Sequence, residues 1–214
     1  MVKPDSALRR LMRETGKLLQ PYGFEGAEPT WTCVLPDGVA TVARSRTFRT
    51  FTAGQQVLSF GFGCWGTPLA WWEFHTWRTE RMGLAPTPIE SAPALGLLPD
   101  DALPEDPATL WSVRVDQGHV FPEDIDTIRA ELPRRIHTCA RRALRLADPA
   151  NYLEELLSQP NPTPAAQEAI IVLLAQRGPT PELDAALTAY LSTTPAPAAQ
   201  ALADYARTRT TAAV

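Results

Sequence analysis

The sequence predicts an α+β fold: an N-terminal helix packed on a curved antiparallel sheet of about four strands, a long kinked helix, and an all-helical tail. Three observations predict it. Apolar residues near the N-terminus recur at helical spacing, and short Ala/Leu-rich segments fill the C-terminal region. Residues 57–65 alternate with period 2, which places Leu58, Phe60, Phe62 and Cys64 on one face and Ser59, Gly61, Gly63 and Trp65 on the other. Period-3.6 and period-2 patterns are the primary signals of amphipathic helices and half-buried strands.

The first helix is expected from Ser6 to about Gln20, with Ser6 as the N-cap. Its apolar stripe comprises Leu8, Leu11, Met12, Thr15, Leu18 and Leu19. The sequence Pro21-Tyr22-Gly23 should end it, because neither proline nor glycine continues a helix cheaply.

Three strands should follow, at residues 30–35, 39–45 and 55–65. Pro36-Asp37-Gly38 reads as the turn between the first two, and residues 49–54 as the connection to the third. Residues 71–81 fit neither the helical nor the strand period, and residues 83–109 read as a long loop. Residues 111–115 alternate again and predict a short fourth strand.

Residues 122–147 keep one apolar face through Pro133, which predicts one long helix with a kink. Three segments then start at Thr163, Thr180 and Ala196, each with a proline near its beginning, and form a weak repeat of short helices. Their expected core is Leu173, Leu174, Leu187, Leu191 and Leu202. The domains predicted from these patterns are an α+β domain at 1–158 and a helical appendage at 159–214.

The order of these elements, with the local sequences WTCVLPDGVATVARSRT and VLSFGFG, resembles the bacterial family catalogued as domain of unknown function 4304. The resemblance covers roughly residues 6–157. It implies a helix, a curved antiparallel sheet and a C-terminal helix. The family has no assigned biochemical role, so the resemblance supplies no catalytic residues.

Composition narrows the class of protein. The 214 residues carry a formal net charge of -4, which makes nucleic acid an unlikely partner. The three cysteines have no regular spacing, which is typical of reduced core thiols. The sequence contains no secretory apolar region and no apolar run near eighteen residues. We therefore expect a cytoplasmic protein that does not span a membrane.

The strongest candidate for a binding site combines glycines with tryptophans. Gly61 and Gly63 lie on one face of the predicted third strand, where a close neighbour is expected. The sequence-based hypothesis is a groove over this face lined by Trp65, Trp71, Trp72 and Trp77, holding a peptide or an apolar ligand. The alternative, which large aromatics favour, is that the indoles fill the same space as core.

A second candidate is catalytic. Glu73 and His75 lie two residues apart, with His119 later in the chain, and a histidine beside carboxylates can act as a general base. No metal-binding spacing, nucleophile motif or phosphate loop accompanies them, so we expect neither a metal nor another cofactor.

The leading prediction is a non-catalytic bacterial binding module that recognises a protein or peptide through the aromatic-lined sheet groove. An immunity-type or accessory role is conceivable for such a module. The alternative is an enzyme of unknown reaction that uses the Glu73 and His75 cluster in the same groove. Oligomeric state does not follow from the sequence.

Overall fold

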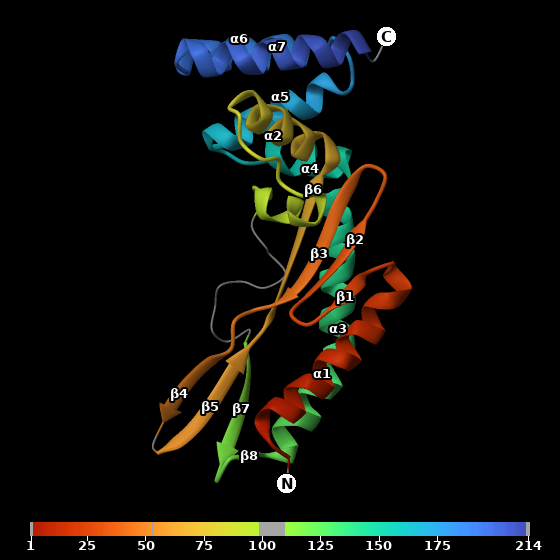
Figure 1. Cartoon of the computed structure of the whole chain (residues 1–214), viewed down its shortest axis with the longest axis vertical. Coiled ribbons are helices and arrows are strands. Elements are labelled where there is room, and N and C mark those ends of the chain that lie inside the picture. The colour runs from red at the N-terminus through yellow and green to blue at the C-terminus, as the bar shows by residue number, and fades with distance from the viewer. Residues whose placement is uncertain (1, 53, 99–109, 213–214) are drawn as a thin grey trace. The chain divides into compact units, whose positions relative to one another are not determined.

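The computed structural model describes residues 2–52, 54–98 and 110–212 and confirms the α+β class (Figure 1). The described strands form two antiparallel sheets of four strands, with the orders β1-β2-β3-β6 and β4-β5-β7-β8, where one sheet of about four was expected. The strands are β1 (Glu25–Ala27), β2 (Thr30–Val34), β3 (Gly38–Arg44), β4 (Phe48–Thr52), β5 (Gln55–Phe60), β6 (Phe62–Pro68), β7 (Trp111–Asp116) and β8 (His119–Val120).

Helices precede and follow the strands. The α-helices are α1 (Pro4–Leu19), α2 (Leu69–Arg81), α3 (Pro122–Ala147), α4 (Pro149–Leu157), α5 (Pro164–Ala175), α6 (Pro181–Thr193) and α7 (Ala196–Ala212), and two 3-10 helices are η1 (Gln20–Tyr22) and η2 (Ile89–Leu95). The ambiguous segment 71–81 is helical, and part of the predicted loop 83–109 forms η2. Residues 99–109 of that loop lie outside the described residues.

The described residues divide into two compact units. The first takes its residues from 1–35, 40–66 and 99–145, and the second from 36–39, 67–98 and 146–214. The predicted boundary at residue 158 does not coincide with this division. The reason is that the tail helices share an apolar core with α2, which precedes them by more than sixty residues.

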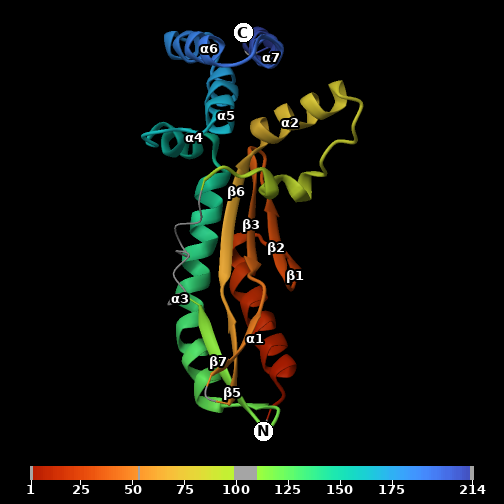
Figure 2. The ribbon, with the colours of Figure 1, turned by 90° about the vertical axis from the view of Figure 1, so that its left-hand side faces the viewer.

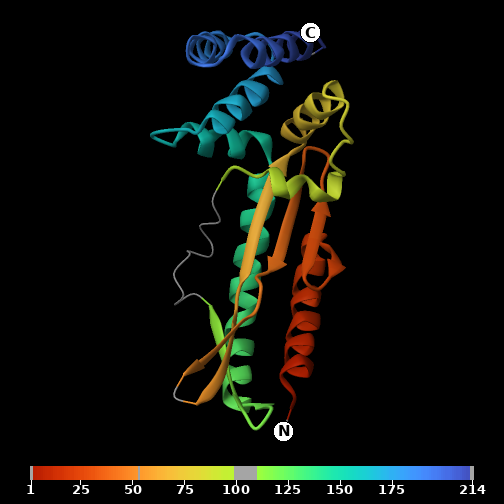
Figure 3. The same cartoon turned by 60° about the vertical axis from the view of Figure 1, so that its left-hand side comes forward.

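In the first unit, α1 and α3 run side by side (Figures 2 and 3). An ion pair of 3.2 Å joins Arg129 of α3 to Glu14 of α1. The predicted N-cap was wrong, because α1 begins at Pro4 with Lys3 as its N-cap. Proline is favoured in the first helical turn, where its missing N–H has no helical partner.

The core of the first unit contains a cluster of aromatic rings. Phe62 lies between Trp31 and Trp111, with ring-centre distances of 6.3 and 5.9 Å, and Phe60 also contacts Trp111 at 5.9 Å. The predicted apolar face of the third strand is buried throughout: Leu58, Phe60, Phe62 and Cys64. The three cysteines are buried and form no disulfide with one another, as expected for core thiols.

The predicted single strand at 55–65 was wrong, because it is two strands in different sheets. β5 ends at Phe60 and β6 begins at Phe62. Between them, the N–H of Gly61 donates to Ser45 Oγ at 2.8 Å, and the N–H of Ser45 donates to the Gly61 carbonyl oxygen at 2.9 Å. These hydrogen bonds satisfy the backbone where the chain changes sheets.

The connection predicted at 49–54 was also wrong in part. Residues 48–52 form β4, which pairs with β5 from Phe48↔Ser59 to Thr52↔Gln55. The other predicted strands are confirmed, with small changes at their ends. α3 is continuous through Pro133, which confirms one long helix.

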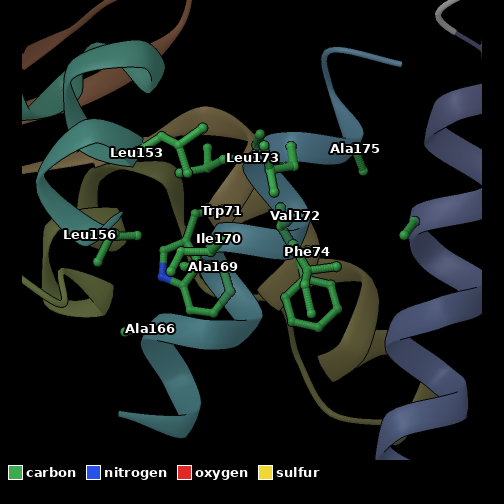
Figure 4. Close-up of a cluster of buried hydrophobic side chains, with 14 of the residues drawn as sticks. Trp71, Phe74, Leu153, Leu156, Ala166, Ala169, Ile170, Val172, Leu173 and Ala175 are labelled. Atoms are coloured by element: carbon green, nitrogen blue, oxygen red, sulfur yellow. The ribbon is translucent and has the colours of Figure 1, made fainter. Parts of the chain in front are cut away.

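The second unit is built around α5, whose residues from Ala169 to Ala175 are all buried. Trp71 and Phe74 of α2 pack into the same cluster as Leu153 and Leu156 of α4 (Figure 4). The predicted helix starts at Thr163 and Thr180 are confirmed, and both threonines cap with their side chains. Of the predicted core, Leu173, Leu174 and Leu202 are buried and Leu187 is partly buried. Leu191 is exposed on α6, so its assignment to the core was wrong.

Phe60→Ala should lower the free energy of unfolding by about 3–5 kcal/mol, because a fully buried ring is removed and a cavity remains. Urea denaturation measures the loss. Phe48→Ala is the matched control, since Phe48 is 52% exposed on β4 and should cost below about 0.5 kcal/mol. Equal losses for the two variants would contradict the assignment of the core.

A chain that ends at Ser158 should lose the structure of α2, because Trp71 and Phe74 would lose the α5 side chains against which they pack. Hydrogen exchange of the amides in residues 69–81, measured by mass spectrometry, should approach the rate of an unfolded segment. Protection equal to that of the full chain would show that α2 folds without the tail helices.

Candidate functional site

The predicted groove over the glycine face is filled by the chain itself. A Cβ atom added to Gly61 would lie 2.9 Å from Leu110 Cδ2, and one added to Gly63 would overlap the indole ring of Trp65. Trp65 is half-buried and folds back over Gly63, two residues before it on β6. The space beside each glycine is therefore occupied by a side chain of the protein itself.

The other three predicted tryptophans belong to α2 and thus to the second unit, whereas the two glycines and Trp65 belong to the first. Trp71 is buried, and its indole N–H donates to the carbonyl oxygen of Leu95 at 3.0 Å. Trp72 donates to the carbonyl oxygen of Thr87 at 2.9 Å. These two hydrogen bonds attach the segment after α2 to the helix. They also satisfy the N–H donors of both indoles.

Trp77 is half-buried and packs against Phe74 and Tyr205, with ring-centre distances of 5.9 and 5.0 Å. Arg81 lies over its other face at 5.0 Å. Trp77 thus covers the end of the helical core, and the three α2 indoles act there as packing and anchoring groups.

Glu73 and His75 have separate partners. Glu73 accepts an ion pair from Arg209 of α7 at 2.8 Å, and Arg209 also lies 5.3 Å over the ring of Tyr205. His75 meets the Trp71 ring edge-on at 4.4 Å, and its Nδ1 lies 3.3 Å from Nη2 of Arg78. The predicted Glu–His pair is therefore not a hydrogen-bonded pair.

His75 begins a chain of polar contacts across three helices. Arg78 donates to Glu168 of α5 at 2.9 Å, and Tyr190 of α6 donates to the other oxygen of Glu168 at 2.7 Å. Burial, followed by the charge of Arg78, lowers the pKa of His75 to about 4, against the opposing effect of Glu168. Burial, followed by the hydrogen bond to Glu168, raises the pKa of Tyr190 to about 12. Near neutral pH the imidazole is uncharged and accepts from Arg78.

His119, the other predicted member of a catalytic cluster, lies in the first unit. Its Nδ1 is 3.0 Å from the carbonyl oxygen of Gln117. Within the described ranges, no group of three or more His, Cys, Asp or Glu side chains is placed to hold a metal ion.

The surface that the sequence analysis missed is the edge strand β4. In the described sheet β4 has one neighbour, β5, and it is the outermost strand of the sheet (Figure 1). Phe48 is 52% exposed and Phe51 is 74% exposed. Arg46 and Arg49 are also exposed, and neither guanidinium has an ion pair or hydrogen bond with the described residues. β4 thus presents two aromatic rings and the cation Arg49 to solvent, and Arg46 lies just before the strand.

The hairpin register shows which backbone groups of β4 are open. Two residues separate the paired residues Thr52 and Gln55, and the pair that closes a two-residue hairpin exchanges both backbone hydrogen bonds. The backbone N–H and C=O groups of Thr50 and Phe48 point to the same side of the strand as those of Thr52, toward β5. The N–H and C=O groups of Arg49 and Phe51 consequently point away from β5.

The opposite edge of the same sheet is protected at Arg114 of β7 and at Val120 of β8. The N–H of Arg114 on β7 donates to Asp124 Oδ2 at 2.8 Å, and the Arg114 carbonyl oxygen accepts from the N–H of Phe121 at 3.2 Å. The guanidinium of Arg114 also binds Asp124, and these hydrogen bonds lower the pKa of the Asp124 carboxyl group. β8 is covered in turn by Val2, whose carbonyl oxygen accepts from the N–H of Val120 at 3.0 Å.

A repeat in the sequence marks this strand. Residues 46–52 read Arg-Thr-Phe-Arg-Thr-Phe-Thr, which is rich in β-branched and aromatic residues that favour strands. The three-residue spacing puts the phenylalanines on opposite faces of the strand, so the period-2 pattern of a buried face is missing.

No family model, curated protein or solved structure matches the chain. The resemblance to the family of domain of unknown function 4304 therefore stays a prediction. No described helix has the length and apolar character needed to cross a membrane.

The lowered pKa of His75 predicts a pH dependence of stability. Below the ordinary pKa of 6.5 the unfolded chain binds a proton that the folded chain accepts only near pH 4, so stability is lost as pH falls through this window. Because the side chain is partly exposed, we expect a loss of about 1–2 kcal/mol between about pH 7 and pH 5.

Urea denaturation of the wild type and of His75→Gln measures this loss. The variant should lack that part of the pH dependence, whereas His119→Gln, the control, should retain it. Parallel stability curves for wild type and His75→Gln would contradict the assignment.

Proposed function

We propose that the protein is a non-catalytic binding module that recognises an extended segment of a partner protein by strand addition to β4. The observation that carries the proposal is the open edge of this strand, with Phe48 and Phe51 exposed beside unpaired backbone groups. In β-strand addition, main-chain hydrogen bonds provide affinity and alternate side chains provide specificity.

The contrast between the two edges of the sheet supports this function. Folded proteins protect sheet edges because an exposed edge is a template for pairing with another chain. Here Asp124, Phe121 and Val2 protect the β7 and β8 side. β4 has no comparable cover within the described residues, so its open groups are available to a partner.

The proposed site on β4 replaces the sheet groove that the sequence predicted. The kind of partner proposed, a protein or peptide, is the same. The space over Gly61 and Gly63 holds Leu110 and Trp65, and Trp71 is buried in the helical core. Aromatic contact area for a partner is instead provided by the phenylalanines of β4. Aromatic side chains supply large contact areas at low entropic cost.

The enzyme alternative has less support. The groups that it requires are engaged elsewhere, Glu73 with Arg209 and His75 with Arg78. A role that consists of binding, such as that of an immunity-type or accessory protein of the bacterial cytoplasm, is compatible with an open strand edge and belongs to this proposal.

Phage-displayed random octapeptides, selected on the full chain, supply probes for the test. Synthetic copies of the selected peptides should slow hydrogen exchange of the Arg49 and Phe51 amides, because these N–H groups would donate to the added strand. Protection confined to other parts of the chain, or no selected peptide at all, would refute the proposal.

Phe51→Pro and Phe51→Ala separate the backbone from the side chain. Both remove the ring, but only proline removes the outward N–H, and it leaves the β5 pairing intact because that N–H does not point to β5. Peptide binding should weaken at least tenfold more in Phe51→Pro than in Phe51→Ala. Equal binding by the two variants would show that the β4 backbone is not used.

A further inference from the structure

We propose that the partner segment combines acidic and apolar residues, with a carboxylate opposite Arg49 and apolar residues opposite Phe48 and Phe51. This inference rests on the proposed function of β4 and adds the chemistry of the strand that it receives. It follows from the register of the sheet and from the charges left without partners.

The charges around the strand leave two cations for a partner. Arg44 forms an ion pair with Glu28 at 2.8 Å, and Arg114 forms one with Asp124 at 2.7 Å. Arg46 and Arg49, in contrast, are exposed and have no acidic partner among the described residues. A cationic segment would be repelled here, whereas an acidic one would gain an ion pair with each side chain.

The register assigns a position to each contact. Arg49 lies opposite Leu58, and Leu58 lies opposite Val113. Arg49 and Phe51 are therefore on the same face of the sheet as these two buried residues. Phe48 lies on the other face, opposite Ser59, whose hydroxyl hydrogen-bonds Ser112 at 3.0 Å. Phe48 therefore has a polar neighbour on β5 and lacks an apolar cross-strand partner, which an added strand would supply.

An antiparallel partner would then present, from its N-terminus, an apolar residue opposite Phe51, a β-former opposite Thr50, an acid opposite Arg49 and an apolar residue opposite Phe48. Arg49 and Phe51 would occupy hydrogen-bonded pairs. Phe48 and Thr50 would occupy non-hydrogen-bonded pairs, where opposed side chains are closer. A second acid would follow at the position facing Arg46.

A second copy of β4 fits this edge less well. Two copies paired antiparallel about Thr50 would set Arg49 of each chain opposite Phe51 of the other. The two Arg49 side chains would then be diagonal neighbours on one face, at a separation where like charges repel. An acidic segment from a different protein avoids this repulsion.

The test uses two synthetic peptides with the full chain: acetylated TVTEVTET, which follows the antiparallel pattern, and TVTKVTKT, in which both acids become lysines. The acidic peptide, carrying a fluorescent label, should bind the wild type at least tenfold more tightly than the basic one in anisotropy titrations. Its binding should weaken with added salt, because the ion pairs are exposed. Arg49→Glu should reverse the preference.

Arg13→Glu is the matched control. It makes the same charge change at an exposed arginine of α1, outside the sheet, and should leave the preference of the wild type unchanged. Far-UV circular dichroism of each variant checks the fold. Light scattering of the same samples reports self-association, and a dimer that the peptides cannot dissociate would overturn the inference in favour of a second copy.

The outcomes separate the two proposals. If β4-dependent peptides emerge from the random library but have no excess of acids, or if Arg49→Glu fails to change the preference, the partner chemistry is wrong and strand addition stands. If no peptide from either source depends on the β4 backbone, both proposals fail.

Discussion

The hydrogen bonds between Ser45 and Gly61 mark the point where the chain passes from one sheet of the first unit to the other. The apolar run from Val57 onward is interrupted after Phe60, so that β5 pairs with β4 and β7 while β6 remains with β3. A Cβ atom at Gly61 would lie 2.9 Å from Leu110 Cδ2, so the glycine leaves room there for the leucine side chain. β4 is the outer strand of the sheet that contains β5.

The second unit depends on a different constraint, which is that α5 is apolar around most of its circumference. Such a helix has no face for water and must be surrounded. α2, α4, α6 and α7 provide that surrounding, and Glu168 of α5 joins Arg78 of α2 to Tyr190 of α6. Trp71 and Trp77, two of the tryptophans that looked like a ligand-binding set, are part of this packing. The indole N–H of Trp71 binds Leu95 of η2, and that of Trp72 binds Thr87 just before η2.

Much of the fold follows from the sequence, because its signals are local. The starts of α5 and α6 are set by a capping threonine followed by proline, and the length of α3 by an apolar face that continues past Pro133. The break at Gly61 could not be predicted from local signals, since the hydrogen bonds there join Gly61 to a residue sixteen positions away. β4 was not predicted for a related reason. A strand exposed on both faces shows no alternation of apolar and polar residues, and only its pairing with β5 identifies it as a strand.

The candidate site was harder to predict than the fold. Tryptophan density indicates contact area, but whether a ring meets a ligand or its own chain is decided by tertiary packing, as Trp65 over Gly63 and Trp71 beside Leu95 show. A strand is a sheet edge when it has no neighbouring strand on one side, and no single residue of the sequence indicates this. Arg46 and Arg49 were visible in the sequence, but that neither has an acidic partner among the described residues is a property of the folded structure.

The asymmetry of the two edges also limits how copies of the chain can pair through this sheet. Head-to-tail growth would require the β4 edge of one copy to pair with the far edge of the next, and Asp124, Phe121 and Val2 bind backbone groups of that edge. Symmetric pairing through two β4 edges is geometrically open, but it sets the Arg49 charges against each other. Both constraints favour the proposal that the β4 edge, with its exposed phenylalanines, receives a single strand from a different protein.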